Sequence, residues 1–333
     1  MTLRHARRRC TLQAVAVVLA ALPASAQTVR EIPLPLTALP AGVAVAPDGS
    51  VWISIMQADR LLRFDPASQR FSSFELTLQS LPRGLVVDAA GRVWFAATGR
   101  SYIGRLDPAD RRVDEFALPS ILDAGLERPT PWALALSRRQ GRVWSALHSS
   151  GKIASVAVDA TPVHRGFVVS EILIADPLAR LDGIAVDREG RVWVAALGRD
   201  EVIRIDPATG AVSRLQLERG SRPRGVAAAP SGVWVALFGS GRVLRIDPAT
   251  LVARAWQLGV GAAPTALTVD DRGAVWVADY GSSAIARLEP ATGSVRSFAA
   301  VASGARVHSV AADARGRVWY VGAFSGRLGV IEP

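Results

Sequence analysis

A short sequence motif, in which a turn ending in glycine is followed by Val-Trp, recurs seven times along the chain. Its tryptophans are separated by 42, 50, 49, 41, 42 and 43 residues. Repeats of about 40 residues are typical of β-propeller blades, each of which packs against its two neighbours. We expect the repeated tryptophans to form the core between blades. They are Trp52, Trp94, Trp144, Trp193, Trp234, Trp276 and Trp319.

Each repeat contains the pattern of four short strands. An apolar run such as residues 183–186 leads to a turn at a glycine such as Gly190, and the Val-Trp strand follows. In five repeats a third strand ends in Asp-Pro or Glu-Pro, as at Asp206 and Pro207, before a fourth strand. Glycine allows the positive φ of hairpin turns, and proline fixes φ in the next turn. Seven such repeats predict an all-β, seven-bladed β-propeller with four antiparallel strands per blade.

The two ends of the repeat region each supply part of one blade. The seventh repeat stops after its third strand, at residues 329–333, whereas residues 29–34 look like a spare fourth strand. We expect this N-terminal strand to complete the last blade, which removes the open seam between the first and last repeats. Residues 27–333 are therefore predicted to form a single seven-bladed domain.

Residues 1–26 have the pattern of a secretory signal peptide. A basic segment at residues 4–9 precedes an apolar segment at residues 12–22, and small residues at 24–26 form a cleavage site. We expect cleavage after Ala26 and a secreted or periplasmic mature protein. The single cysteine, Cys10, would leave with the signal, which excludes disulfides and thiol catalysis in the mature chain. We expect no membrane partner after cleavage.

Charge is spread along the chain rather than clustered. The formal net charge is +10, and loss of the four signal arginines leaves +6. Basic residues alternate with acidic ones, whereas nucleic-acid binding requires a basic patch. We therefore expect no nucleic-acid partner, and we expect a monomer.

Candidate site residues follow from the repeat. The first strand of each blade lines the central channel, and the residue just before it faces the end where propellers usually bind ligands. That position is held by Ala41, Arg83, Trp132, Asp182, Arg224, Thr265 and His308. The third residue after each tryptophan gives a second ring, which includes Asp279, and the next residue is His148 or Tyr280 in two loops. We predict ligand binding by Arg83, Trp132, Asp182, Arg224, Thr265, His148 and Tyr280.

The polar residues of the first ring have two interpretations. Arg83 and Arg224 present two guanidinium forks to an anionic ligand, because this group matches carboxylate and phosphate geometry. Alternatively, both arginines pair with Asp182 across the channel and bind nothing else. Trp132 either stacks on a ligand ring or fills the channel.

Several lines of the sequence resemble the repeats of the virginiamycin B lyase (streptogramin lyase) family. They are AVWVAD at residues 274–279, RIDPATG at residues 204–210 and EIPLP at residues 31–35. The resemblance covers residues 28–333. It implies a seven-bladed propeller and a carbon–oxygen lyase that linearises streptogramin B-type cyclic depsipeptides, with a histidine base and Mg²⁺ held by a glutamate.

The positions of the family's catalytic residues hold other residue types here. The resemblance places its two histidines at Arg224 and Thr265 and its glutamate at Asp279. A guanidinium stays protonated at neutral pH and an unassisted hydroxyl is a very weak base, so neither replaces a histidine.

Three functions fit these residues, and we favour the first. The first is a secreted lyase-like propeller that lacks standard streptogramin B cleavage and binds an unidentified small-molecule or anionic ligand, or a protein partner, in the central funnel. The second is an active Mg²⁺-dependent carbon–oxygen lyase with a rearranged site, in which His308 is the catalytic base and Asp279 the metal ligand. The third is a non-catalytic, NHL-like protein-interaction scaffold, which residues 275–279 also fit.

Overall fold

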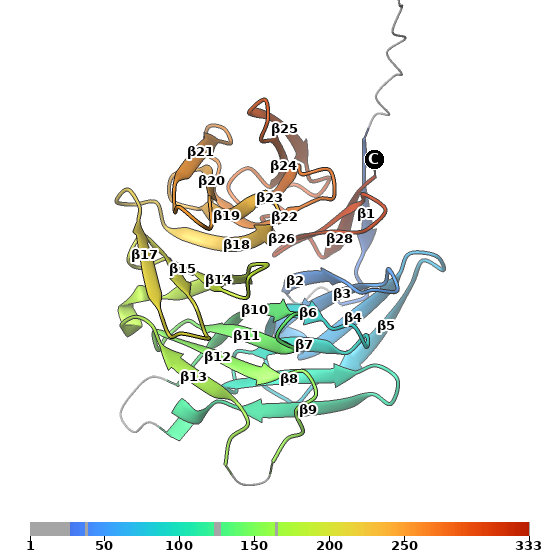
Figure 1. Ribbon diagram of the computed structural model, residues 1–333. Helices are drawn as coiled ribbons and strands as arrows, with labels where there is room; N and C mark the ends of the chain where they lie inside the picture. The colour runs from blue at the N-terminus through green and yellow to red at the C-terminus, as the bar shows by residue number, and fades with distance from the viewer. Residues whose placement is uncertain (1–26, 37–38, 123–127, 164–165, 333) are drawn as a thin grey trace, which may run out of the picture.

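A computed structural model describes residues 27–36, 39–122, 128–163 and 166–332, which form seven four-stranded sheets around a central axis (Figure 1). Neighbouring strands within each blade pair in an antiparallel direction. The all-β, seven-bladed propeller predicted from the repeats is confirmed. The predicted signal peptide, residues 1–26, lies outside the described residues.

The strands of each blade follow one another outward from the axis, except that the last blade ends with β1. Within the described residues, three short 3-10 helices lie in connections between strands: η1 (Met56–Ala58), η2 (Pro119–Leu122) and η3 (Pro177–Ala179). None of the helices in the described ranges is long and apolar enough to cross a membrane. The blades comprise β2 (Pro40–Val45), β3 (Val51–Ile55), β4 (Arg60–Asp65) and β5 (Arg70–Glu75); β6 (Pro82–Val87), β7 (Val93–Ala97), β8 (Tyr102–Asp107) and β9 (Arg112–Ala117); β10 (Pro131–Ser137), β11 (Arg142–Leu147), β12 (Lys152–Ala157) and β13 (Ser170–Leu173); β14 (Leu181–Val186), β15 (Val192–Ala196), β16 (Glu201–Ile205) and β17 (Val212–Gln216); β18 (Pro223–Ala229), β19 (Gly232–Leu237), β20 (Arg242–Ile246) and β21 (Ala253–Gln257); β22 (Pro264–Val269), β23 (Val275–Asp279), β24 (Ala284–Glu289) and β25 (Ser294–Ala299); and β26 (Val307–Ala312), β27 (Val318–Gly322), β28 (Arg327–Glu332) and β1 (Thr28–Pro33).

The N-terminal strand closes the last blade, as predicted. β1 pairs with β28 in an antiparallel register that runs from Thr28 opposite Glu332 to Pro33 opposite Arg327. Glu31 adds a side-chain link, because its carboxylate accepts a hydrogen bond of 2.8 Å from the Tyr320 hydroxyl. Backbone pairing and this side-chain link together join the first and last strands of the propeller, so the ring of blades has no open seam.

The repeated tryptophans form the core between blades, as predicted. Their exposed fractions are between 0% and 3%. Seven hydrophobic clusters each combine residues of two neighbouring blades, and each cluster contains one of the seven tryptophans. The burial of one large aromatic side chain at every interface is a main source of cohesion, because apolar area removed from water stabilises the fold at roughly 25 cal/mol per Å².

An aspartate in the first turn holds the tryptophan in four of the blades. Asp88, Asp187, Asp270 and Asp313 each accept a hydrogen bond from the indole N–H six residues later, at 2.8 to 3.0 Å. The same carboxylates accept backbone N–H groups of their own turn. Each of these acids therefore fixes the turn and satisfies a buried indole donor at once.

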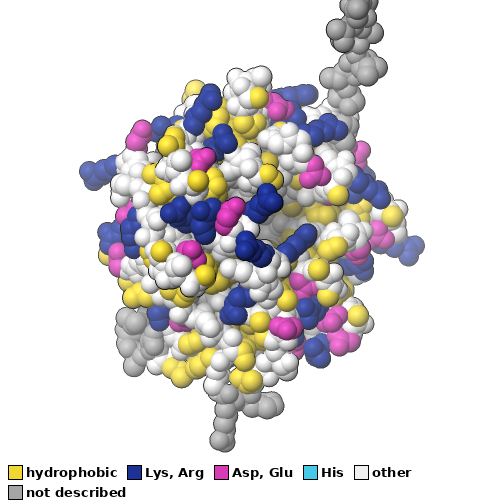
Figure 2. All heavy atoms as spheres, viewed as in Figure 1, with side chains coloured by type: hydrophobic (Ala, Val, Ile, Leu, Met, Phe, Trp, Pro, Cys, Tyr) yellow, Lys and Arg dark blue, Asp and Glu magenta, His cyan; other side chains and the backbone are white. Residues whose placement is uncertain are grey.

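The seven inner strands, β2, β6, β10, β14, β18, β22 and β26, contact one another in order around the axis and close into a ring. The face of the disc seen in Figure 2 is hollowed at its middle, and basic side chains gather around that hollow. The axis of the molecule is therefore a channel whose walls are the inner strands.

We predict that Asp313→Ala lowers the free energy of unfolding by about 2–4 kcal/mol, because the Trp319 indole N–H and the Arg317 guanidinium both lose a buried partner. Asp48→Ala is the matched control, because Asp48 occupies the corresponding turn but its side chain is 56% exposed and bonds Ser50 and Arg63. Its cost should be below about 1 kcal/mol. Urea denaturation followed by tryptophan fluorescence measures both, and equal losses would contradict the role of the buried aspartate.

Candidate functional site

Each inner strand begins with a β-bulge, and the bulge positions the predicted ring residue. Pairing between the first and second strands skips from Pro82 to Leu85 in the second blade and from Leu181 to Ile184 in the fourth. The same irregularity occurs in all seven blades, and every ring residue lies within it. A bulge releases a residue from the ladder and turns its side chain away from the sheet's regular alternation. All seven predicted ring residues therefore face one cavity.

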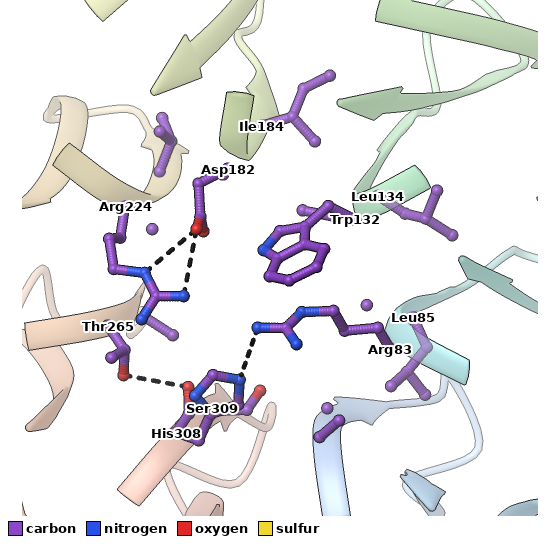
Figure 3. Close-up of a pocket in the computed structure, with 18 of the residues that line it drawn as sticks. Arg83, Leu85, Trp132, Leu134, Asp182, Ile184, Arg224, Thr265, His308 and Ser309 are labelled. Carbon is purple, nitrogen blue, oxygen red and sulfur yellow. Dashed lines mark hydrogen bonds and ion pairs between the residues drawn. The ribbon is translucent and has the colours of Figure 1, made fainter. Parts of the chain in front are cut away.

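This cavity, hereafter the entrance cavity, has a volume of about 190 Å³. The seven ring residues line it together with the small residues that follow them, such as Gly42, Gly183 and Ser309. Figure 3 shows Arg83, Asp182, Arg224 and His308 directed toward its middle from four different blades. The sequence-based grouping of these residues is therefore confirmed as a spatial one; their role in binding stays a prediction.

Asp182 pairs with one of the two arginines. Both Nε and Nη2 of Arg224 lie 3.2 Å from Oδ2 of Asp182 (Figure 3). The two side chains are 16% and 10% exposed, so water screens the pair weakly. The alternative in which the arginines pair across the channel therefore holds for Arg224 only.

Arg83 lies against an aromatic ring instead of a carboxylate. Its guanidinium carbon is 3.5 Å from the centre of the Trp132 ring, and its Nη2 is 3.4 Å from Nε2 of His308. Among the described residues no acidic side chain forms an ion pair with it. Burial lowers the pKa of Arg83 to about 10, against the attraction of Asp182, so the group still carries its charge at neutral pH.

Trp132 is covered on both faces. Arg83 lies over it, and the imidazole of His148 stacks on it with ring centres 4.5 Å apart at 20°. His148 is held in turn, because its Nδ1 is 3.0 Å from the carbonyl oxygen of Leu181, and burial lowers its pKa. Trp132 lies in the channel, as one of the two interpretations from the sequence had it. The indole supports Arg83 and leaves no free face for a ligand ring.

His308 is held as a neutral imidazole. Burial first, and then the positive charges of Arg83 and Arg224, lower its pKa to about 3. Since an Arg83 N–H points at Nε2, that nitrogen accepts the hydrogen bond and the ring proton lies on Nδ1.

Thr265 and Asp279 have structural partners. The Thr265 hydroxyl lies 3.2 Å from the carbonyl oxygens of Ala278 and His308, so it ties the sixth blade to the seventh. Asp279 accepts the backbone N–H of Ala263 at 2.7 Å and the hydroxyl of Ser282 at 2.5 Å. Asp279 does not line the entrance cavity. His308 lines the entrance cavity and Asp279 lies off it, so their roles as catalytic base and metal ligand stay predictions.

The donor set does not fit Mg²⁺. This ion prefers several oxygen ligands, whereas Asp182, already bound to Arg224, is the one carboxylate among the described residues that line the entrance cavity. No cluster of three or more His, Cys, Asp or Glu residues that could hold a metal occurs in the part of the chain that the structure describes. Tyr280 also lies off the cavity, where Arg306 covers its ring at 5.0 Å.

Sequence reasoning missed a second layer of the channel. Two residues after each ring residue, every inner strand carries an aliphatic side chain that also packs into a core between blades. These seven side chains, one from each inner strand, form a circular layer around the channel, hereafter the aliphatic ring: Val43, Leu85, Leu134, Ile184, Val226, Leu267 and Val310. The alignment of the repeats contains this signal, because the position is Val, Leu or Ile in all seven.

The fold and this arrangement define a seven-bladed β-propeller with a basic cavity at one end of its channel. The family model described as the virginiamycin B lyase family matches residues 169–333. In its fold the chain is similar to virginiamycin B lyases, as its repeats predicted. No curated protein sequence matches the chain.

Solved structures agree on the fold. The chain is similar to a streptogramin B lyase, with 20% identity and a TM-score of 0.82 over 92% of this chain and 97% of the other. It is also similar to virginiamycin B lyase from Staphylococcus aureus, with 17% identity and a TM-score of 0.82 over 92% and 100%. A chain of the Mitotic Checkpoint Complex matches at 11% identity and a TM-score of 0.74 over 98% and 99%. Structural similarity at these sequence identities shows the fold, whereas the activity has to be inferred from the residues of the site.

The neutral state of His308 has a measurable consequence for stability. Its pKa of about 3 in the folded protein lies below the ordinary value of 6.5, so the unfolded chain takes up the proton first as the pH falls. This contribution is fully present above pH 6.5 and is lost between pH 6.5 and 3. Between pH 6 and 4 we expect the free energy of unfolding of the wild type to fall by roughly 1.4 kcal/mol per pH unit more than that of His308→Gln. Urea denaturation across this range measures the difference, and parallel curves would contradict a buried neutral His308.

Proposed function

We propose that this protein binds a small anion, of the carboxylate class, in the entrance cavity, with Arg83 as the main anion-binding group. The observation that carries the proposal is the charge of the lining residues. The described lining residues include two guanidinium groups, those of Arg83 and Arg224, and one carboxylate, that of Asp182. This carboxylate already forms an ion pair with Arg224. With His308 neutral, one positive charge in the cavity has no acidic partner.

The surroundings of Arg83 prepare it to receive an anion. Stacking on Trp132, which His148 supports from behind, fixes the plane of the guanidinium. A planar group held in this way loses little conformational freedom when it forms two parallel hydrogen bonds to a carboxylate. The surrounding protein also excludes much of the water that would weaken such a bond.

The size of the cavity limits the ligand. Pockets for drug-sized ligands occupy roughly 300–1,000 Å³, whereas this cavity has about 190 Å³. A carboxylate with a few carbon atoms fits this space better than a large cyclic peptide does. A larger ligand would have to lie mostly outside, with one anionic group inserted.

We further propose that standard streptogramin B cleavage is absent. The two positions at which the resemblance places histidines hold Arg224, which is bound to Asp182, and Thr265, which is bound to backbone carbonyls. The residues present do not fit Mg²⁺. One of the similar solved structures is a catalytically inactive histidine-to-alanine variant of virginiamycin B lyase with quinupristin, so in that protein a histidine is required.

A rearranged lyase is the second candidate, because one observation favours it. His308 is unprotonated at neutral pH and faces the cavity, so it is in the form that a general base needs. Its Nε2, however, accepts from Arg83, and among the described residues no second charged side chain forms a hydrogen bond with it.

Anion binding is tested by thermal unfolding at constant ionic strength with sodium acetate, pyruvate, phosphate or sulfate replacing chloride. We expect a saturable rise in melting temperature with acetate or pyruvate. Arg83→Met, which keeps the contact with Trp132 but removes the charge, should weaken binding at least tenfold. Arg219→Met is the matched control, since this exposed arginine has no side-chain partner among the described residues. Binding that survives Arg83→Met unchanged, or no binding of any of the four anions, would contradict the proposal.

The lyase candidate is tested separately with residues 27–333, Mg²⁺ and a cyclic streptogramin B, and with EDTA as the control. Elimination opens the ring without a change of mass, so chromatographic retention and loss of antibiotic activity are the readouts. We expect no linearisation above the level in buffer. Metal-dependent turnover that disappears in His308→Ala would establish the second candidate instead.

A further inference from the structure

A second and larger cavity, hereafter the exit cavity, opens at the opposite end of the inner strands. Its volume is about 970 Å³. Ring residues at the beginning of the inner strands line the entrance cavity, whereas the ends of those strands and their following turns line this one. Four members of the aliphatic ring, Val43, Leu85, Leu134 and Leu267, line both cavities, so this layer lies between them.

The part of the exit cavity formed by the inner strands carries mostly apolar side chains, whereas polar and charged residues lie in the turns around it. Two residues beyond the aliphatic ring, the inner strands again carry apolar side chains, among them Val45, Val87, Leu136 and Val186, and these line the cavity. The side chains from the seventh blade, Val310 and Ala312, continue the same surface. A cavity of this volume, with apolar side chains along its inner strands, lies within the size range of small-molecule sites.

The mouth of the exit cavity is basic. Arg138 and Arg139 follow β10, and Arg188 follows β14, so three guanidinium groups come from two adjacent turns. Arg138 and Arg188 are exposed, and within the described ranges neither side chain has an ion pair or a hydrogen bond. Arg139 bonds the backbone carbonyl of Arg188 at 3.4 Å, which leaves its charge uncompensated.

The acid at this mouth does not offset that charge. Asp187 is bound by Arg191 at 2.7 Å, by the Trp193 indole at 2.8 Å and by backbone N–H groups of its own turn. Its carboxylate is therefore part of the turn that holds the tryptophan. The net charge of the groups facing the mouth is positive, and it lies directly beside the apolar side chains of the cavity.

We propose that the exit cavity binds an aliphatic monocarboxylate, with the hydrocarbon chain along the apolar side chains of the inner strands and the carboxylate at Arg138 and Arg188. The hydrocarbon chain is removed from water when it contacts the apolar side chains of the cavity. The single carboxylate forms charge-assisted hydrogen bonds with the unpaired guanidinium groups at the rim. This site is separate from the entrance cavity and does not depend on the proposed function there.

Isothermal titration calorimetry of the mature chain with decanoate, below its micelle concentration, tests this site. We expect saturable binding that becomes about fourfold tighter for each methylene added from hexanoate to decanoate. Acetate, which lacks the chain, should not compete with decanoate. Decanol, which lacks the charge, should bind at least tenfold more weakly.

The double variant Arg138→Gln, Arg188→Gln should weaken decanoate binding at least tenfold, and both residues lie in exposed turns whose substitution leaves the core intact. Arg272→Gln is the matched control, because Arg272 is an exposed arginine in the corresponding turn of the sixth blade and does not line the exit cavity. Arg83→Met should leave decanoate binding unchanged, which separates the two cavities. The proposal is overturned if decanoate shows no saturable binding, if decanol binds equally well, or if Arg272→Gln causes the same loss as the double variant.

Discussion

The site depends on how closely the seven inner strands approach one another at their bulges. A Cβ atom added to Gly183 would lie 2.2 Å from the carbonyl oxygen of Arg224, and one added to Gly42 would lie 2.6 Å from that of Arg83. A side chain at either position would push the neighbouring blade away. The glycine after a ring residue thus lets the next blade's ring residue come close enough to share one small cavity.

The same approach explains why the polar groups of the ring interact across blades. Arg224 reaches Asp182 from the neighbouring blade, and Arg83 reaches Trp132 in the same way. Hydroxyl groups fix this spacing: Ser54 donates to the carbonyl of Arg83 at 2.6 Å, and Thr265 bonds that of His308. The core tryptophans and the closure by β1 keep the blades in place around them. The charge of the cavity is therefore a property of the assembled ring, and no single blade contains it.

Much of this architecture was predictable because the repeat imposes one register on every blade. The seven-bladed fold, the closing strand and the membership of the ring all follow from aligning the copies by their tryptophans. The contacts of each side chain were harder to predict, because a repeat fixes where a residue lies but does not determine which neighbour it contacts. Arg83 lies on Trp132 while Arg224 takes Asp182, and the sequence treats the two arginines alike. Asp279 aligned with a metal ligand, but its turn uses both of its oxygens.

We propose that the guanidinium of Arg83, which forms no ion pair among the described residues, holds an anion in the entrance cavity. Bromide is a small anion that anomalous X-ray diffraction locates directly, so crystals of the mature protein soaked in sodium bromide provide the most direct measurement. We expect an anomalous peak in the entrance cavity within about 3.5 Å of the Arg83 guanidinium nitrogens, and none there in crystals of Arg83→Met. A cavity without bromide in the wild type, in crystals where exposed arginines do carry it, would contradict the claim.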